Sequence, residues 1–192
     1  MSGGFIVVLA ILAFAAVTIF KGVRIVPQGY KWIVQRLGKY HTTLSPGLNF
    51  VIPYVDEVAY KVTTKDIVLD IPSQEVITRD NAVLLMNAVA YINITTPVNA
   101  VYGIENYTWA IQNLVQTSLR SIVGEMDLDD ALSSRDHIKA KLKAAISDDI
   151  SDWGITLKTV EIQDIQPSST MQAAMEAQAA AERQRRATVT KA

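Results

Sequence analysis

The sequence predicts an α+β protein in which an N-terminal transmembrane helix precedes a soluble domain and an alanine-rich helix ends the chain. Three observations point to this fold class. The first twenty residues are almost wholly apolar, strand-like segments fill the chain as far as Ile94, and apolar residues recur with helical spacing after Pro97. Strands followed by helices along one chain are typical of the α+β class.

Composition narrows the range of functions. The chain has 192 residues, which is enough for one core-forming domain with appendages. Its formal net charge of −1 provides no overall field that would attract nucleic acid, so no nucleic-acid partner is expected. The absence of cysteine excludes disulfides, thiolate catalysis, zinc–thiolate sites and palmitoylation.

The segment from Gly3 to Phe20 is expected to be the membrane anchor. It carries no charge and no proline, and at about 1.5 Å per residue it covers about 27 Å, close to the thickness of a hydrocarbon core. A signal peptide would need a basic N-terminal region, and a buried core helix is rarely so uniformly apolar. The side chains expected to face lipid are Phe5, Ile6, Val7, Val8, Leu9, Ile11, Leu12, Phe14, Val17, Ile19 and Phe20.

Basic residues follow the apolar segment and none precedes it. Because cytoplasmic flanks carry an excess of Lys and Arg, the N-terminus is expected outside and the bulk of the chain in the cytoplasm. The basic residues are Lys21, Arg24, Lys31, Arg36 and Lys39.

The first part of the soluble domain reads as short strands and an apolar loop. Residues 24–34 predict two strands with a bend at Pro27-Gln28-Gly29, and Leu37-Gly38-Lys39 begins a turn. The prolines in residues 44–55 exclude a regular central strand through that stretch. This loop either dips into the membrane interface or places Phe50 and Ile52 in the core, and the core is slightly favoured. The interface candidates are Trp32, Leu48, Phe50, Ile52 and Tyr54.

A mostly antiparallel sheet is expected next. Residues 58–71 and 75–78 are strand-like, Asp80-Asn81 supplies a turn, and residues 83–94 form a long strand.

Two helices and a strand follow. Asn106 is placed to cap the first helix, which ends at Gly124, and Ser133-Ser134 precedes the second, which Gly154 ends. Residues 155–165 alternate as a strand, with one slip that suggests a bulge. The apolar helical positions are Ile111, Leu114, Val115, Leu119, Ile122 and Val123 in the first helix, and Ile138, Leu142, Ala145, Ile146, Ile150 and Trp153 in the second.

The last helix begins after Pro167 and has an unusual composition. Alanine, the best helix former, dominates it, and few large apolar residues follow its two methionines. It should therefore pack against copies of itself or continue into a longer coil, and its pattern breaks off without a C-cap, so we expect it to extend beyond Ala192. Glu182 and Arg186 have the spacing of a favourable pair. The assembly candidates are Met171, Met175, Ala179, Glu182, Arg183 and Arg186.

No group of residues suggests catalysis, a cofactor or a metal. His41 and His137 lie far apart, and no phosphate-binding glycine motif or nucleophile elbow occurs. Two aspartate clusters, at 127–130 and 148–152, lack the alternating ligands of a calcium loop. We therefore find no candidate catalytic residue for a membrane hydrolase, and the chain is expected not to be an enzyme.

Six segments, in order, resemble the stomatin/prohibitin/flotillin superfamily, also called SPFH or band 7. They are the apolar N-terminal segment, VPQGYKWIVQRLGKYHTTLSPGLNFVIPYVDEV, TRDNAVLLMNAVAYINI, TSLRSIVGEMDLDDALSSRD, WGITLKTVEIQDIQP and MEAQAAAERQRRA. Within the superfamily the chain is most similar to bacterial paraslipins of the QmcA type. It departs from animal stomatin in having no cysteine.

The resemblance implies a fold with four parts. An anchor at 1–22 precedes an SPFH domain of two small mixed α/β subdomains. The first, at 23–95, is mostly antiparallel and membrane-proximal, and the second, at 96–166, contains helices and a strand. Residues 167–192 begin a long coiled coil.

The resemblance also implies a function. Related proteins form homo-oligomeric rings or cages that enclose a patch of membrane lipid, here the bacterial cytoplasmic (inner) membrane, and so act as scaffolds in membrane-protein quality control. Further implied partners are a membrane-anchored AAA+ protease of the FtsH type and an NfeD-type membrane protein. The alternative is an adaptor that regulates such a protease or a channel, with assembly secondary.

Overall fold

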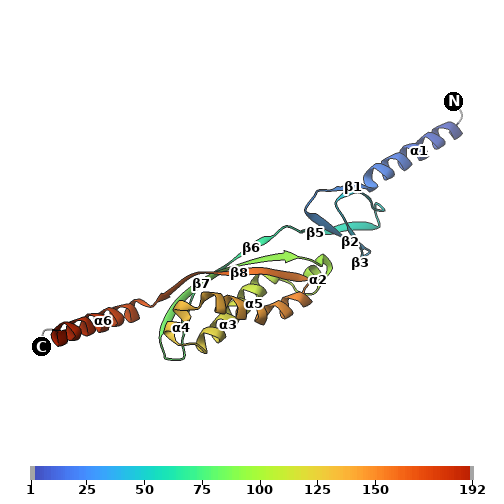
Figure 1. Ribbon diagram of the computed structural model, residues 1–192. Coiled ribbons are helices and arrows are strands. Elements are labelled where there is room, and N and C mark those ends of the chain that lie inside the picture. The colour runs from blue at the N-terminus through green and yellow to red at the C-terminus, as the bar shows by residue number, and fades with distance from the viewer. Residues whose placement is uncertain (1–2, 191–192) are drawn as a thin grey trace. The chain divides into compact units, whose positions relative to one another are not determined.

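The computed structural model describes residues 3–190, apart from the side chains of Ile6, Glu182, Arg185 and residues 187–190. It divides into two compact units, and each is described by itself. Unit 1 comprises Met1–Asp66, Asn93–Glu105 and Trp153–Ile155, and unit 2 comprises Ile67–Ile92, Asn106–Asp152 and Thr156–Ala192. In chain order the elements (Figure 1) are α1 (Gly3–Gly22), β1 (Val23–Val26), β2 (Tyr30–Arg36), β3 (Lys39–Leu44), β4 (Gly47–Phe50), β5 (Asp56–Thr63), β6 (Ile67–Ile77), β7 (Val83–Ile94), α2 (Pro97–Tyr102), α3 (Tyr107–Gly124), α4 (Leu128–Ser133), α5 (Arg135–Asp152), β8 (Ile155–Pro167) and α6 (Ser169–Thr190).

Unit 1 contains two small antiparallel sheets. β1 pairs with β4 as a two-stranded ribbon, and β2 lies between β3 and β5. Leu37 and Gly38 both have positive φ, as the tight hairpin between β2 and β3 requires. One buried core cluster of this unit consists of Val26, Val34, Leu44 and Val51, with Tyr30, Trp32 and Val58 packed around it.

Gly154 joins distant segments within unit 1. Its carbonyl oxygen accepts hydrogen bonds from the N–H groups of Thr95 and Thr96, both at 2.9 Å. Its φ of 67° lies in the left-handed region, and a Cβ here would lie 2.4 Å from the carbonyl oxygen of Thr96. Only glycine meets both demands without strain.

Unit 2 packs helices on a three-stranded sheet with the order β6-β7-β8. Figure 1 shows α3, α4 and α5 on one side of this sheet. The buried residues of the two long helices recur every three or four positions, which is the spacing of a single helix face. They are Ile111, Val115, Leu119, Ile122 and Val123 in α3, and Ile138, Leu142, Ile146 and Ile150 in α5.

Several expected elements are confirmed. β7 spans Val83–Ile94, and the turn before it contains Asn81 with positive φ. The Asn106 side chain accepts a hydrogen bond from the N–H of Trp109 and so caps α3, which ends at Gly124. Among the positions expected to be apolar and inward, Leu114 and Trp153 are only half-buried and Ala145 is exposed.

The strand expected at 58–71 is wrong, because β5 ends at Thr63 and β6 begins at Ile67. Asn93 Nδ2 donates to both the Thr64 carbonyl oxygen and Asp66 Oδ1, each at 2.9 Å, and holds the break. β6 then continues to Ile77 through a register shift between Ile71 and Gln74, where Pro72 is tolerated because a bulge needs no ladder hydrogen bond. β3 was not expected at all.

The transmembrane helix of the expected fold class must be corrected. A helix does form over Gly3–Gly22, but among the described residues no helix is both long and apolar enough to cross a membrane. The expectation depended on a segment of about 27 Å, which is at the lower limit for a hydrocarbon core of about 30 Å.

The coiled coil must be corrected as well. α6 is one helix, and in the described part of the chain no second helix winds around it. Two-stranded coils need large apolar residues every three or four positions, whereas the residues after Met175 at those positions are mostly alanine. The domain boundaries expected at 22, 95 and 166 stay predictions.

Candidate functional site

Helix α1 exposes its apolar side chains. Every large apolar side chain described in this helix, from Phe5 to Phe20, is at least half exposed, and Ile6 lies outside the described side chains. Exposed apolar side chains that are contiguous along an element mark an interaction surface rather than a core helix.

The ribbon of β1 and β4 continues this exposed apolar character. Val23 pairs with Phe50 and Ile25 pairs with Leu48, so alternation places these four side chains on one face of the ribbon. Ile25, Leu48 and Phe50 are all exposed by more than half.

The segment after β4 exposes two more of the interface candidates. Phe50 is 68% exposed and Ile52 is 54% exposed, so the favoured expectation that they face the core is wrong. Val51, between them, fills the core instead and donates its N–H to the Gly22 carbonyl oxygen at 2.9 Å. Tyr54 is exposed and has a φ of 71°, a left-handed conformation that costs energy for a residue with a side chain.

We define the apolar surface as the exposed apolar side chains of α1 together with Ile25, Leu48, Phe50, Ile52 and Tyr54. The remaining interface candidate, Trp32, is half-buried on β2, outside this set.

Asp56 fixes the loop that carries Ile52 and Tyr54. Arg36 binds it with two hydrogen bonds, Nε to Oδ1 at 2.7 Å and Nη2 to Oδ2 at 3.0 Å, and the Ile52 N–H donates to Oδ2 at 2.9 Å. The Asp56 side chain is only 4% exposed. These hydrogen bonds, that from Arg36 first, lower the pKa of the Asp56 carboxyl to about 2 despite its burial.

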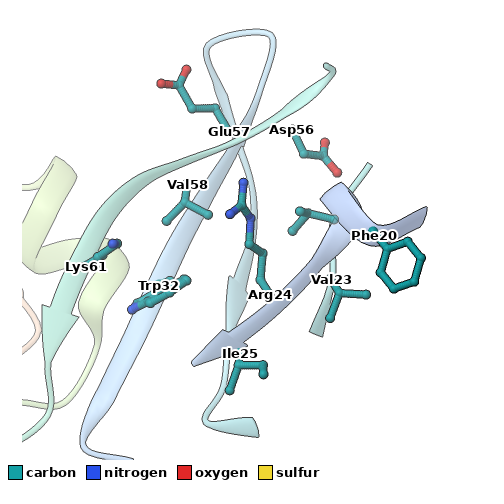
Figure 2. A pocket seen from close by; sticks show the side chains of 10 residues that line it. Phe20, Val23, Arg24, Ile25, Trp32, Asp56, Glu57, Val58 and Lys61 are labelled. Atoms are coloured by element: carbon teal, nitrogen blue, oxygen red, sulfur yellow. The ribbon is translucent and has the colours of Figure 1, made fainter. Parts of the chain in front are cut away.

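A pocket of about 780 Å³ opens beside the C-terminal end of α1 (Figure 2). β1, β2 and β5 line it together with Phe20 and Val51, and its charged residues are Arg24, Asp56, Glu57 and Lys61. The Lys61 ammonium lies 4.6 Å from the centre of the Trp32 ring, a favourable cation–π contact. Sequence reasoning missed this pocket, because its residues come from four segments.

Only some of the assembly candidates on α6 lie together in one hollow. Met171, Met175 and Ala179 line a hollow of about 500 Å³ with Asp80, Asp127 and Leu128, all within unit 2. Arg183 and Arg186 are exposed, whereas the Glu182 side chain, and so its expected pair with Arg186, lies outside the described residues.

Three exposed tyrosines form a cluster that the sequence did not suggest. The Tyr102 ring packs edge-on against Tyr40 and Tyr60, with ring centres 6.3 and 5.9 Å apart. Gln35 Nε2 donates to the Tyr102 hydroxyl at 2.8 Å and orients it.

Among the described residues, the two histidines do not form part of a catalytic or metal-binding group. His41 and His137 are exposed, and in the part of the chain that the structure describes no three His, Cys, Asp or Glu side chains gather as a metal site would need.

Comparisons with known proteins agree on one family. Residues 24–192 match the model of the SPFH domain / Band 7 family. The chain is 40% identical to a stomatin homolog of Pyrococcus abyssi, over 97% of this chain and 69% of that protein. It is 38% identical to human mitochondrial stomatin-like protein 2, over 85% of this chain and 46% of that protein. A Mycobacterium tuberculosis protein is 36% identical over 97% of this chain, which spans about half (49%) of that relative's length.

Proposed function

The chain belongs to the SPFH domain / Band 7 family, and on that premise we propose that it is a membrane-associated scaffold that assembles with copies of itself. The apolar surface is the observation that carries the proposal. Family membership supports the same role, and the closer likeness to bacterial paraslipins stays a prediction.

Contact with lipid is the first part of the proposal. Full burial of one Leu, Ile or Phe side chain stabilises a complex by about 1.5–3 kcal/mol, and the described side chains of α1 include ten exposed ones of this kind. The cationic residues just after α1, Lys21 and Arg24, favour an anionic leaflet. We place the protein at the bacterial cytoplasmic membrane, with both units on the cytoplasmic side.

Self-association through α6 is the second part. This helix is mostly exposed and rich in alanine, whose small side chain lets a neighbouring helix approach closely. One such contact buries little area, but closure into a ring or cage makes many weak contacts act together. Such a ring would enclose a membrane patch and restrain the proteins inside it, which is a role in membrane-protein quality control.

A second candidate function is an adaptor for a membrane-anchored AAA+ protease of the FtsH type, an NfeD-type membrane protein or a channel. The cluster of Tyr40, Tyr60 and Tyr102 favours it, because each ring is almost half exposed and tyrosine is enriched where proteins dock.

The assembly test is Ala180→Pro, with Ala180→Ser as the matched control. Proline inside a helix costs about 3 kcal/mol, whereas serine keeps the helix. We expect the mass of the detergent-extracted full chain, measured by light scattering, to fall to that of a protomer only for the proline variant. If the proline variant loses both assembly and binding of the partner protein, the scaffold is favoured. If single protomers still bind the partner protein, the adaptor is favoured.

The membrane test is the double variant Leu9→Glu/Leu12→Glu. Its control is Val68→Glu/Ile77→Glu, two exposed apolar residues of β6 in unit 2. We expect the fraction that floats with phosphatidylcholine vesicles to fall at least tenfold for the α1 variant alone, because charged side chains resist transfer into lipid. Equal flotation of parent and α1 variant would contradict contact through α1.

A further inference from the structure

We propose that the pocket between β1, β2 and β5 binds the anionic phosphodiester headgroup of a membrane lipid. The inference rests on the proposed membrane association and adds the ligand that unit 1 would select. The cavity, about 780 Å³, falls within the usual range for small-ligand sites.

Arg24 supplies the main cationic group. Figure 2 shows its side chain extending from β1 toward β5, where Asp56 and Val58 lie. Within the described part of the chain Arg24 makes no hydrogen bond or ion pair, so its guanidinium donors are available. A guanidinium suits a phosphodiester, because two of its N–H groups can bind two phosphate oxygens at once.

The carboxylates of the pocket do not neutralise Arg24. Both oxygens of Asp56 already accept hydrogen bonds, from Arg36 and from the Ile52 N–H. The Glu57 carboxylate points away from Arg24 in Figure 2. Lys61 adds a second cation, held over the Trp32 ring at 4.6 Å. Since Asp56 is balanced by Arg36, the lining residues leave one net positive charge, which suits a monoanion.

The apolar part of the lining favours a lipid over a soluble phosphate. Phe20, Val23, Ile25, Val51 and Val58 share the pocket with the charged residues, and Phe20 and Ile25 are also exposed. Val23 and Ile25 share one face of the ribbon with Leu48 and Phe50 of the apolar surface, whereas Arg24, between them, points to the other face of β1. A ligand with an anionic group next to hydrocarbon would satisfy both kinds of lining residue.

Trp32 lies in the pocket and can report on its occupancy. In a Trp109→Phe/Trp153→Phe background it is the sole tryptophan of the full chain, since the sequence has three. We would follow its emission as phosphatidylglycerol replaces phosphatidylcholine in vesicles that carry the protein. The expected result is a saturable change, with Arg24→Gln raising the half-saturating phosphatidylglycerol fraction about tenfold, as loss of a charge-assisted pair predicts.

Lys39→Gln is the matched control, because Lys39 is an exposed cation of β3 in the same unit that does not line the pocket. It should leave the response unchanged. If Lys39→Gln weakens the Trp32 response as much as Arg24→Gln does, diffuse surface charge explains the response and the proposal is wrong. If Arg24→Gln does not weaken the response, there is no such site.

Two further measurements distinguish a lipid ligand from a soluble phosphodiester, and failure of the pocket from failure of membrane association. If glycerophosphoglycerol in solution saturates the same Arg24-dependent response in phosphatidylcholine vesicles at millimolar concentration, the site takes a soluble phosphodiester and the lipid assignment is wrong. A protein that floats with vesicles but shows no Trp32 response contradicts only the pocket. A protein that does not float with any vesicle contradicts the proposed membrane association itself.

Discussion

Asp56 connects three segments of unit 1 through one carboxylate. It stands at the start of β5, binds Arg36 at the end of β2, and accepts the Ile52 N–H from the loop that exposes Ile52 and Tyr54. Because the side chain is almost wholly buried, water cannot replace these partners. The conformation of the exposed loop therefore depends on the charge of one residue.

Asp56→Asn should reduce stability in a pH-dependent way. The pKa of the parent's Asp56 carboxyl is about 2 in the folded protein, compared with an ordinary value of 3.8. The carboxylate therefore stabilises the fold above about pH 4, and this stabilisation is lost as the pH falls toward 2. We expect Asn to lower the free energy of unfolding by about 1 kcal/mol at pH 7 and to leave little difference from the parent at pH 2. Urea unfolding at pH 7, 4 and 2 measures this.

Asp148→Asn, on the exposed side of α5, serves as the control and should show neither the loss at pH 7 nor the convergence. A parent and an Asp56→Asn variant that unfold at the same urea concentration at pH 7 would show that Arg36 and Asp56 contribute nothing to the fold.

At the scale of elements, two glycines with positive φ should differ in their tolerance of alanine. Both Gly38 and Gly154 are left-handed, at φ of 82° and 67°. A Cβ at Gly38 meets nothing within 4 Å, whereas at Gly154 it would meet the Thr96 carbonyl oxygen at 2.4 Å. We expect Gly38→Ala to cost about 1 kcal/mol from the backbone alone, and Gly154→Ala about 3 kcal/mol.

Thermal or urea unfolding of both variants against the parent gives the two costs. Their difference isolates the steric term, since the backbone term is shared. Equal costs would mean that the close approach of Gly154 to Thr96 is relieved by a small shift, and that the link between them tolerates a side chain.

Elements that local signals determine could be predicted. β7 and α3 lie where a run rich in Val, Leu and Ile, an Asn cap and a terminal Gly predict them, because each signal acts within a few residues. The break between β5 and β6 depends on Asn93, some thirty positions later, whose side chain binds Thr64 and Asp66. A window along the sequence does not contain such a contact, so the break was missed.

The candidate site divides in the same way. Leu48, Phe50 and Tyr54 stand out in the sequence because they are large apolar residues in a stretch with two prolines, but only the fold shows that they are exposed. Their role at a membrane interface stays a prediction. The pocket and the tyrosine cluster were not predicted, because Tyr40, Tyr60 and Tyr102 meet only when β3, β5 and α2 come together.

At the scale of the whole molecule, charge and apolar area make different contributions to membrane contact. The net charge of −1 gives no overall attraction to an anionic surface, so the proposed attachment rests chiefly on the apolar surface, with Lys21 and Arg24 as a local cationic addition. Selectivity among headgroups, by contrast, depends on a few cations of unit 1, chiefly Arg24 and Lys61. These two contributions predict different responses to salt.

The final prediction compares those responses in one sample of the full chain. Raising salt from about 0.01 M to 0.15 M shortens the Debye length from about 30 Å to about 8 Å, which weakens exposed charge interactions but not apolar contact. We expect flotation with phosphatidylcholine vesicles to stay constant, while the phosphatidylglycerol preference reported by Trp32 falls severalfold. If salt instead releases the protein from the vesicles, then charge holds it there and the apolar surface has another partner. The first such partner to test is a second copy of the chain, which light scattering would detect.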